Sequence, residues 1–263
     1  MKYLILRRVV QISILVLFSF SAFGFILKGD LSSSKLFSTI PLSDPFAVLQ
    51  IYLASFSVDM MALLGACVVL ILYGVFLGRA FCAWVCPVNL ITDFAAFIRV
   101  KFGFKANKSL ILSKNLRYYL LGLVLILSFA LSLPVFEGIS YIGIVHRGII
   151  FGGASWLFVA FVIFCIDAFL SPRATCSHLC PLGAFYALMT RFALLKIKHR
   201  VSKCTKCYHC VSVCPEKQVL WMIGKESASV NSGECIRCGG CIDVCNDDAL
   251  SFNIFDLRKK DEK

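Results

Sequence analysis

The sequence has few charged side chains. Asp, Glu, Lys and Arg make up 16% of its 263 residues, whereas hydrophobic residues make up 59%. Soluble proteins usually carry a larger charged share, so this composition argues against an ordinary soluble domain. Acidic residues are the scarcer kind, 15 against 27 basic ones, and the formal net charge is +12. No nucleic-acid-binding motif accompanies this charge, and we expect no nucleic-acid partner.

Four long stretches contain no charge at all: 9–27, 60–77, 118–136 and 148–166. Each is close to the ~20 residues with which a helix crosses ~30 Å of hydrocarbon. We therefore predict a membrane all-α domain over residues 1–190, with four transmembrane helices arranged as two hairpins. A fifth apolar stretch, 46–58, is too short to span the membrane, and Asp44 and Pro45 before it are typical of a helix start.

The basic residues are unevenly distributed along the chain. They gather in the N-terminal tail, after the second apolar stretch and after the fourth, while the other two connections are poor in them. Cytoplasmic loops carry the excess of Lys and Arg in membrane proteins. We therefore expect a multi-pass protein of the bacterial inner (cytoplasmic) membrane with both termini in the cytoplasm. No clear signal-peptidase site follows the first stretch, which predicts an uncleaved anchor.

Cysteine is abundant, with 14 residues, and eight of them form two copies of one C-x2-C-x2-C-x3-C run. The copies are Cys204, Cys207, Cys210, Cys214 and Cys235, Cys238, Cys241, Cys245. Such a run is typical of two-cluster bacterial ferredoxins. Zinc sites usually offer paired CxxC units instead, and Pro215 after the first copy also favours iron–sulfur ligation. The sequence therefore predicts two [4Fe–4S] clusters.

The spacing also predicts how the cysteines are shared between the clusters. Three cysteines of one loop wrap three irons, and the distant cysteine of the other copy ligates the fourth. We expect the first cluster on Cys204, Cys207, Cys210 and Cys245, and the second on Cys235, Cys238, Cys241 and Cys214. Each copy continues into a β-like run, 219–223 or 250–254. We predict a small α+β ferredoxin-like domain over 203–263, after a basic linker at 191–202.

A second repeated motif, C-x3-C-P, follows the second and fourth apolar stretches. It contains Cys82 and Cys86 in one copy and Cys176 and Cys180 in the other. Four thiols from two such pairs could hold a third cluster or another metal such as zinc, or act as a redox-active dithiol set. The alternative is a structural turn in which proline ends a helix. His178 lies inside the second copy only, so a shared ligand role for it is not expected.

The order of these parts resembles the NapH family, ferredoxin-type membrane proteins of periplasmic nitrate reduction that are regarded as quinol dehydrogenase components. The motifs that carry the resemblance are 82–87, 176–181 and the eight cysteines from Cys204 to Cys245. The resemblance covers essentially the whole length. NosR-like, MauN-like and CcoG-like proteins share the architecture, but this chain lacks the large extra domain of the NosR type.

The resemblance implies an electron-transfer subunit rather than a terminal reductase. Menaquinol or ubiquinol would be oxidised in the lipid membrane, and electrons would pass through the clusters to a NapG-like iron–sulfur protein, towards a periplasmic nitrate reductase. No residue is assigned a catalytic role, and the quinone site is not located. The alternative is an assembly or maturation factor for a partner metalloenzyme, as among the CcoG-like, NosR-like and MauN-like relatives. A redox sensor ranks third, because nothing resembles an output domain.

Overall fold

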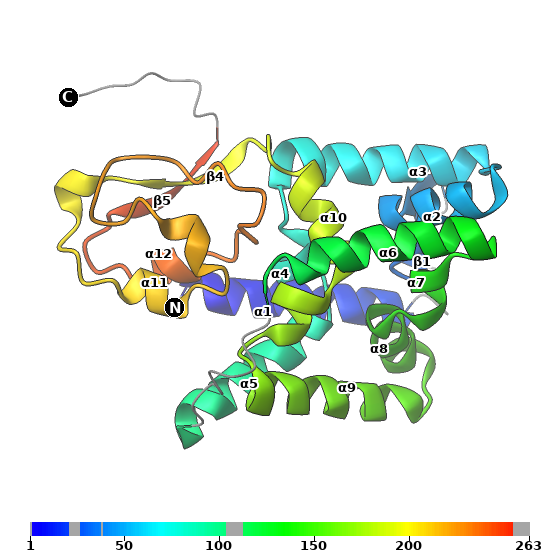
Figure 1. Ribbon diagram of the computed structural model, residues 1–263, viewed down its shortest axis with the longest axis horizontal. Helices are drawn as coiled ribbons and strands as arrows, with labels where there is room; N and C mark the ends of the chain where they lie inside the picture. Colours follow the sequence, from blue (N-terminus) through cyan, green and yellow to red (C-terminus); the bar gives the residue numbers. More distant parts are fainter. Residues whose placement is uncertain (1, 21–26, 38, 104–112, 255–263) are drawn as a thin grey trace. The chain divides into compact units, whose positions relative to one another are not determined.

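The computed structural model describes residues 2–20, 27–37, 39–103 and 113–254 (Figure 1). The chain divides into two compact units. The first, which we call the cysteine-rich unit, comprises Met1–Val10, Ile71–Trp84 and Tyr186–Lys263. The second, the helical unit, comprises Gln11–Leu70 and Val85–Phe185.

The helical unit contains a small antiparallel meander that the sequence did not predict. Its strands are β1 (Leu27–Gly29), β2 (Ser33–Leu36) and β3 (Ile40–Ser43), paired in the order β1-β2-β3. Helix α2 (Pro45–Ser55) follows at once. The Asp44 side chain caps α2 by accepting from the Phe46 amide at 3.1 Å, which confirms the helix start expected from Asp44 and Pro45.

Short helices build the rest of this unit. They are α5 (Val88–Phe102), α6 (Leu116–Leu131), α7 (Val135–Ile139), α8 (Tyr141–Phe151), α9 (Ser155–Cys165) with its extension η4 (Ile166–Leu170), and η5 (Thr175–Leu179). Aromatic rings fill the core, where Phe46 lies 5.6 Å from Phe136 and 5.3 Å from Phe185 between ring centroids. The buried Arg99 ties α5 to η4 by donating to the carbonyls of Asp167 and Ala168.

The prediction of an all-α domain with four transmembrane helices is wrong. Among the described residues, one helix is long and apolar enough to cross a membrane: Met60–Leu77, formed by α3 (Met60–Ile71) and its continuation η2 (Leu72–Leu77). The 9–27 stretch falls partly in α1 (Lys2–Ser19), whose first seven residues include the basic Lys2, Arg7 and Arg8. Positions 21–26 lie outside the described residues.

The other two stretches are interrupted by helix-ending residues. Helix α6 stops at Ser132, which has a left-handed backbone, and Pro134 follows. Its 16 residues span about 24 Å, less than the ~30 Å of a hydrocarbon core. The 148–166 stretch is divided between α8 and α9 by Gly152 and Gly153, both at positive φ. Apolar composition without continuous helix thus misled the prediction.

The cysteine-rich unit is built on a two-stranded antiparallel sheet. Strand β4 (Leu195–His199) pairs with β5 (Leu250–Ile254). The unit also contains short helices: α4 (Phe81–Trp84), η6 (Val201–Lys203), α11 (His209–Val213), η7 (Lys217–Leu220) and α12 (Gly240–Asp243). Helix α10 (Pro181–Met189) precedes β4. Figure 1 shows β4 and β5 side by side.

Two local expectations for this region differ from the structure. Residues 191–202, which the sequence suggested as a linker, contain β4. The run 219–223 contains the end of η7 and the turn after it and is not a strand, whereas 250–254 is a strand as expected. The partner of β5 is therefore β4, and the buried side chains of both repeats pack into one core around Met222 and Ile197.

Candidate functional site

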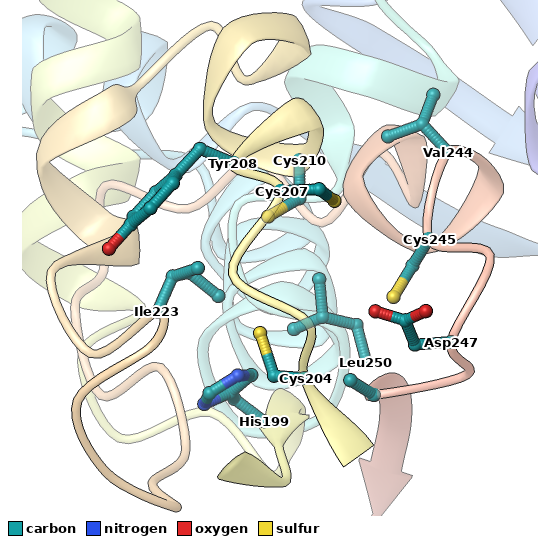
Figure 2. Close-up of a pocket in the computed structure, with 11 residues that line it drawn as sticks. His199, Cys204, Cys207, Tyr208, Cys210, Ile223, Val244, Cys245, Asp247 and Leu250 are labelled. Atoms are coloured by element: carbon teal, nitrogen blue, oxygen red, sulfur yellow. The ribbon is translucent and has the colours of Figure 1, made fainter.

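Four cysteine side chains gather around one pocket of the cysteine-rich unit: Cys204, Cys207, Cys210 and Cys245 (Figure 2). The first three come from the first cysteine loop, and the fourth comes from the end of the second copy. Cys210 is buried and Cys207 is exposed. The exposed Cys207 opens this first pocket to solvent, and the polar side chains of His199 and Asp247 form part of its wall.

The remaining four cysteines of the two runs line a second pocket: Cys214, Cys235, Cys238 and Cys241. Here the second loop supplies three residues and the first copy supplies Cys214. Cys235 and Cys241 are buried. Apolar side chains make up most of the remaining wall, among them Ile197, Val219 and Leu220. The second pocket is therefore more enclosed than the first.

Both cysteine loops bend in the same way because the same positions adopt a left-handed backbone. In the first loop these are Lys206 (φ 61°) and Tyr208 (φ 57°), and in the second they are Arg237 (φ 50°) and Gly239 (φ 74°). Glycine is needed at 239, since a Cβ there would lie 2.7 Å from the Tyr3 side chain. Tyr208 at the matching place is exposed. The duplicated spacing thus produces duplicated loop geometry with different surroundings.

The pKa values of the pocket cysteines reflect this enclosure. Burial raises the pKa of Cys214 to about 12 and that of Cys235 to about 11, and it raises the pKa of Cys241 and of Cys210 as well. Metal ligation requires the thiolate, so an iron centre bound here would have to supply the favourable energy that burial withholds. Four thiols around each pocket are a donor set that fits a [4Fe–4S] cluster.

His199 lines the first pocket, although its sequence context had suggested a solvent-facing side chain. It is fully buried, and its Nδ1 donates to the Glu226 carbonyl at 2.8 Å. A histidine among lysines looks like a surface residue. The alternation Lys-Ile-Lys-His in β4 was the available signal, because it puts His199 on the same face as the buried Ile197.

The four C-x3-C-P cysteines are divided between the two units. Cys82 lies in α4 of the cysteine-rich unit, whereas Cys86, Cys176 and Cys180 belong to the helical unit. Cys180 follows η5 in an extended conformation, and its Sγ accepts from the Gly183 amide at 3.3 Å. In the described ranges, no group of three or more His, Cys, Asp or Glu is arranged to hold a single metal ion.

Three of these thiols do share a neighbour within the helical unit. Burial, and next the charges of Cys180, Cys176 and Cys86, raise the pKa of Tyr141 well above its usual value. The Tyr141 hydroxyl is itself shielded from solvent. Cysteines of both C-x3-C-P copies therefore lie close enough to Tyr141 to act on its hydroxyl, and no sequence motif identified this residue.

Comparison with known protein families agrees with the cysteine geometry. A model described as a 4Fe-4S binding domain matches residues 58–105 and again 153–202, and a 4Fe-4S dicluster domain matches residues 196–246. The first model covers both C-x3-C-P motifs, which agrees with an internal repeat there. The second covers all eight cysteines of the two runs. No solved structure gives a significant match.

Curated relatives match over nearly the whole chain. The ferredoxin-type protein NapH of Haemophilus influenzae is 39% identical over 96% of this chain and 90% of its own length. NapH of Escherichia coli is 34% identical over 95% and 89%, and the methylamine utilization ferredoxin-type protein MauN of Paracoccus denitrificans is 37% identical over 89% and 84%. This chain therefore belongs to the NapH family of ferredoxin-type electron-transfer proteins with 4Fe-4S domains.

Proposed function

We propose that the protein is a membrane-associated subunit that takes electrons from quinol and passes them through two [4Fe–4S] clusters. The observation that carries the proposal is the exchange of cysteines between the two copies. Each pocket has three cysteines of one loop and the fourth from the other copy. A [4Fe–4S] cluster supplies one-electron redox chemistry, which suits a protein that divides the two electrons of a quinol.

The proposed ligands of the first cluster are Cys204, Cys207, Cys210 and Cys245. Those of the second are Cys235, Cys238, Cys241 and Cys214. The protein's own residues hold these thiolates in place and, at the second pocket, keep water away through Val219 and Leu220.

Chemical analysis of anaerobically purified protein tests the clusters. We expect about eight iron atoms and eight acid-labile sulfides per chain, the content of two [4Fe–4S] clusters, and paramagnetic signals after reduction. A Cys207→Ser or Cys238→Ser variant should lose or alter one signal and keep the other. Protein that binds no labile sulfide would contradict the proposal. If such protein contained zinc, the two pockets would be zinc sites.

The direction of electron flow rests on the NapH relatives. We propose a NapG-like iron–sulfur protein as the electron acceptor, with a periplasmic nitrate reductase beyond it. Anaerobic membranes that contain this protein and the acceptor should oxidise added quinol and reduce the acceptor. The Cys238→Ser variant should not. Unchanged electron flux in that variant would remove the second cluster from the route.

A second candidate function is supported by the MauN matches, because MauN is named for methylamine utilization and not for nitrate. In this role the chain would donate electrons while a partner metalloenzyme is assembled. The two roles differ in turnover. A partner that stays active after this chain is removed indicates assembly, whereas a partner that needs it in every cycle indicates electron transfer.

Helix Met60–Leu77 supports membrane attachment. Its large apolar side chains face outward, with Met60 67%, Leu64 50% and Ile71 54% exposed. Exposed apolar surface of this extent is typical of a membrane or protein interface. The basic residues after Leu77 favour a cytoplasmic location for that side of the helix, in the inner membrane. The cytoplasmic location of both termini depended on four spans and stays a prediction.

The C-x3-C-P thiols are proposed as a redox-active set, with Cys86, Cys176 and Cys180 as its members in the helical unit. Their common approach to Tyr141 supports this role. Differential alkylation tests it: oxidised protein should protect these thiols, and reduction should expose them. If the three thiols are alkylated equally in oxidised and reduced protein, they are not redox-active and have a structural role in the turn. Metal analysis of a variant that lacks the eight ferredoxin cysteines would show whether they hold a third metal or cluster.

A further inference from the structure

The two cysteine loops carry a cation at the same position but in opposite surroundings. Lys206 lies two residues after Cys204, and Arg237 lies two residues after Cys235, both with a left-handed backbone. Lys206 is exposed. Arg237 is only 2% exposed. The duplication thus supplies a natural pair of residues in which one charge is solvated and the other is buried beside cluster ligands.

The Arg237 side chain is fixed by carbonyl groups. Its Nε donates to the Leu195 carbonyl at 2.6 Å, and its Nη1 donates to the Cys235 carbonyl at 3.1 Å. The guanidinium also packs on Gly78, where a Cβ would lie 1.9 Å from it. The Arg237 carbonyl in turn accepts from the Trp84 indole at 3.0 Å. These contacts hold the charge at one place beside the second loop.

No carboxylate of the described residues forms an ion pair with Arg237. Its hydrogen bonds go to neutral carbonyls, so its positive charge is buried without an acidic partner. Burying an uncompensated charge is costly, and the cysteine thiolates are the negative groups available to offset it. The hydrogen bond to the Cys235 carbonyl keeps this charge within the second cysteine loop.

The carboxylates near the two pockets strengthen the contrast. Glu216 and Asp247 occupy equivalent positions, each two residues after the last cysteine of its run. Glu216 forms a buried ion pair with Arg79, at 3.5 Å, so its charge is offset. Asp247 lines the first pocket, where its carboxylate accepts from the amide and the hydroxyl of Thr205. Those hydrogen bonds hold the carboxylate of Asp247 at the wall of the first pocket.

We propose that Arg237 is a positioning residue that raises the reduction potential of the second cluster above that of the first. Reduction adds one negative charge to a cluster, and a buried cation stabilises that charge more than a solvated one does. Asp247 acts in the opposite direction at the first pocket. In partly reduced protein the electron then resides on the second cluster. The inference depends on the cluster ligands proposed above.

The test is a redox titration of full-length protein, followed by electron paramagnetic resonance. Arg237→Gln removes the charge. We expect the equilibrium constant for reduction of the second cluster to fall about tenfold, which lowers its reduction potential by ~59 mV for a one-electron couple. Arg237→Lys restores a cation and should recover most of the loss. Lys206→Gln is the matched control and should shift the first cluster by much less, because its charge is solvated.

Iron and sulfide content, measured first, separates this inference from the proposed function. Protein without two clusters contradicts the proposed function itself. If Arg237→Gln keeps both clusters and neither potential changes, Arg237 has a structural role only. If Arg237→Gln loses its clusters, the order of the two potentials in the unsubstituted protein tests the inference. The signal that Cys238→Ser alters belongs to the second cluster, and it must appear at the higher potential. If it appears at the lower potential, the inference is overturned.

Discussion

The two cysteine loops have the same spacing and the same backbone bend, yet they differ in what covers them. In the first loop, residues 205–209 are all exposed. In the second, Cys235, Ile236, Arg237 and Gly239 are buried. The bend therefore depends on the cysteine spacing, and the enclosure depends on residues far away in the sequence.

Two distant segments cover the second loop. The N-terminal residues approach it, with the amides of Tyr3 and Leu4 donating to the Asp243 carboxylate at 3.0 and 2.8 Å. The Gly78–Trp84 segment packs on Arg237. A gene duplication can copy a ligand loop, but these contacts arise outside the duplicated stretch. One copy can thereby become a buried site while the other stays accessible to a partner protein.

The largest effect should come from replacing a buried ligand. Cys241 is only 5% exposed, so Cys241→Ser removes both a thiolate of the second pocket and a contact in the core. We expect loss of about half of the bound iron and a strong fall in the unfolding temperature. Cys207→Ser should lose as much iron with a smaller fall, since Cys207 is exposed. Equal destabilisation would show that the two loops contribute alike to folding.

The buried ion pair should give the next largest effect. Arg79 and Glu216 are both 2% exposed, so Arg79→Met leaves a buried carboxylate without its cation. Breaking a buried ion pair costs up to ~3–5 kcal/mol in the free energy of unfolding, and the hydrogen bond from Gln218 to Glu216 reduces that cost here. The double variant Arg79→Met, Glu216→Gln should recover part of it. Urea unfolding of the purified protein measures both.

A matched pair elsewhere in the chain serves as the control for that experiment. Arg147 is 44% exposed and pairs with Glu137 at 3.0 Å. Exposed pairs contribute ~0–1 kcal/mol, so Arg147→Met should change stability little. A large effect of Arg147→Met, or none of Arg79→Met, would contradict the ranking by burial.

Glycine substitution probes the contact between the N-terminus and the second loop. Gly239 and Gly103 both have positive φ, at 74° and 67°, so alanine carries the same backbone strain of ~1–2 kcal/mol at each. Only at Gly239 does the added Cβ also meet another side chain, that of Tyr3 at 2.7 Å. Gly239→Ala should therefore destabilise the protein more than Gly103→Ala. Equal changes in the unfolding midpoint would mean that Tyr3 moves aside at no cost.

The sequence was a good guide where spacing alone decides geometry. The C-x2-C-x2-C-x3-C runs indicated iron–sulfur domains, which the family matches bear out. The sequence was a poor guide to helix length. The hydropathy of 118–136 and 148–166 does not reveal that helices end at Ser132 and Gly152. Apolar runs identify buried or lipid-facing segments, whereas continuity of the backbone depends on a few residues within them.

Side chains that act through tertiary contacts were beyond the reach of the sequence. Arg237 looked like an ordinary loop cation, equivalent to Lys206, and its burial depends on Gly78 and Trp84 more than 150 residues earlier. His199 could have been found from the alternation in β4 if that strand had been expected. Tyr141 could not, since nothing local to it marks a neighbour of the C-x3-C-P thiols.

The smallest predicted effect concerns the single hydrogen bond from Trp84 to the second loop. Trp84→Phe removes the indole N–H that donates to the Arg237 carbonyl at 3.0 Å, and it should cost ~0.5–1.5 kcal/mol. Trp221→Phe is the control, because Trp221 is 60% exposed and the change in side chain is the same. Trp84→Phe should also broaden the paramagnetic signal of the second cluster, as Arg237 gains freedom, and leave the first unchanged. If both variants behave alike, the Gly78–Trp84 segment does not hold the second loop, and its enclosure must come from the N-terminal residues instead.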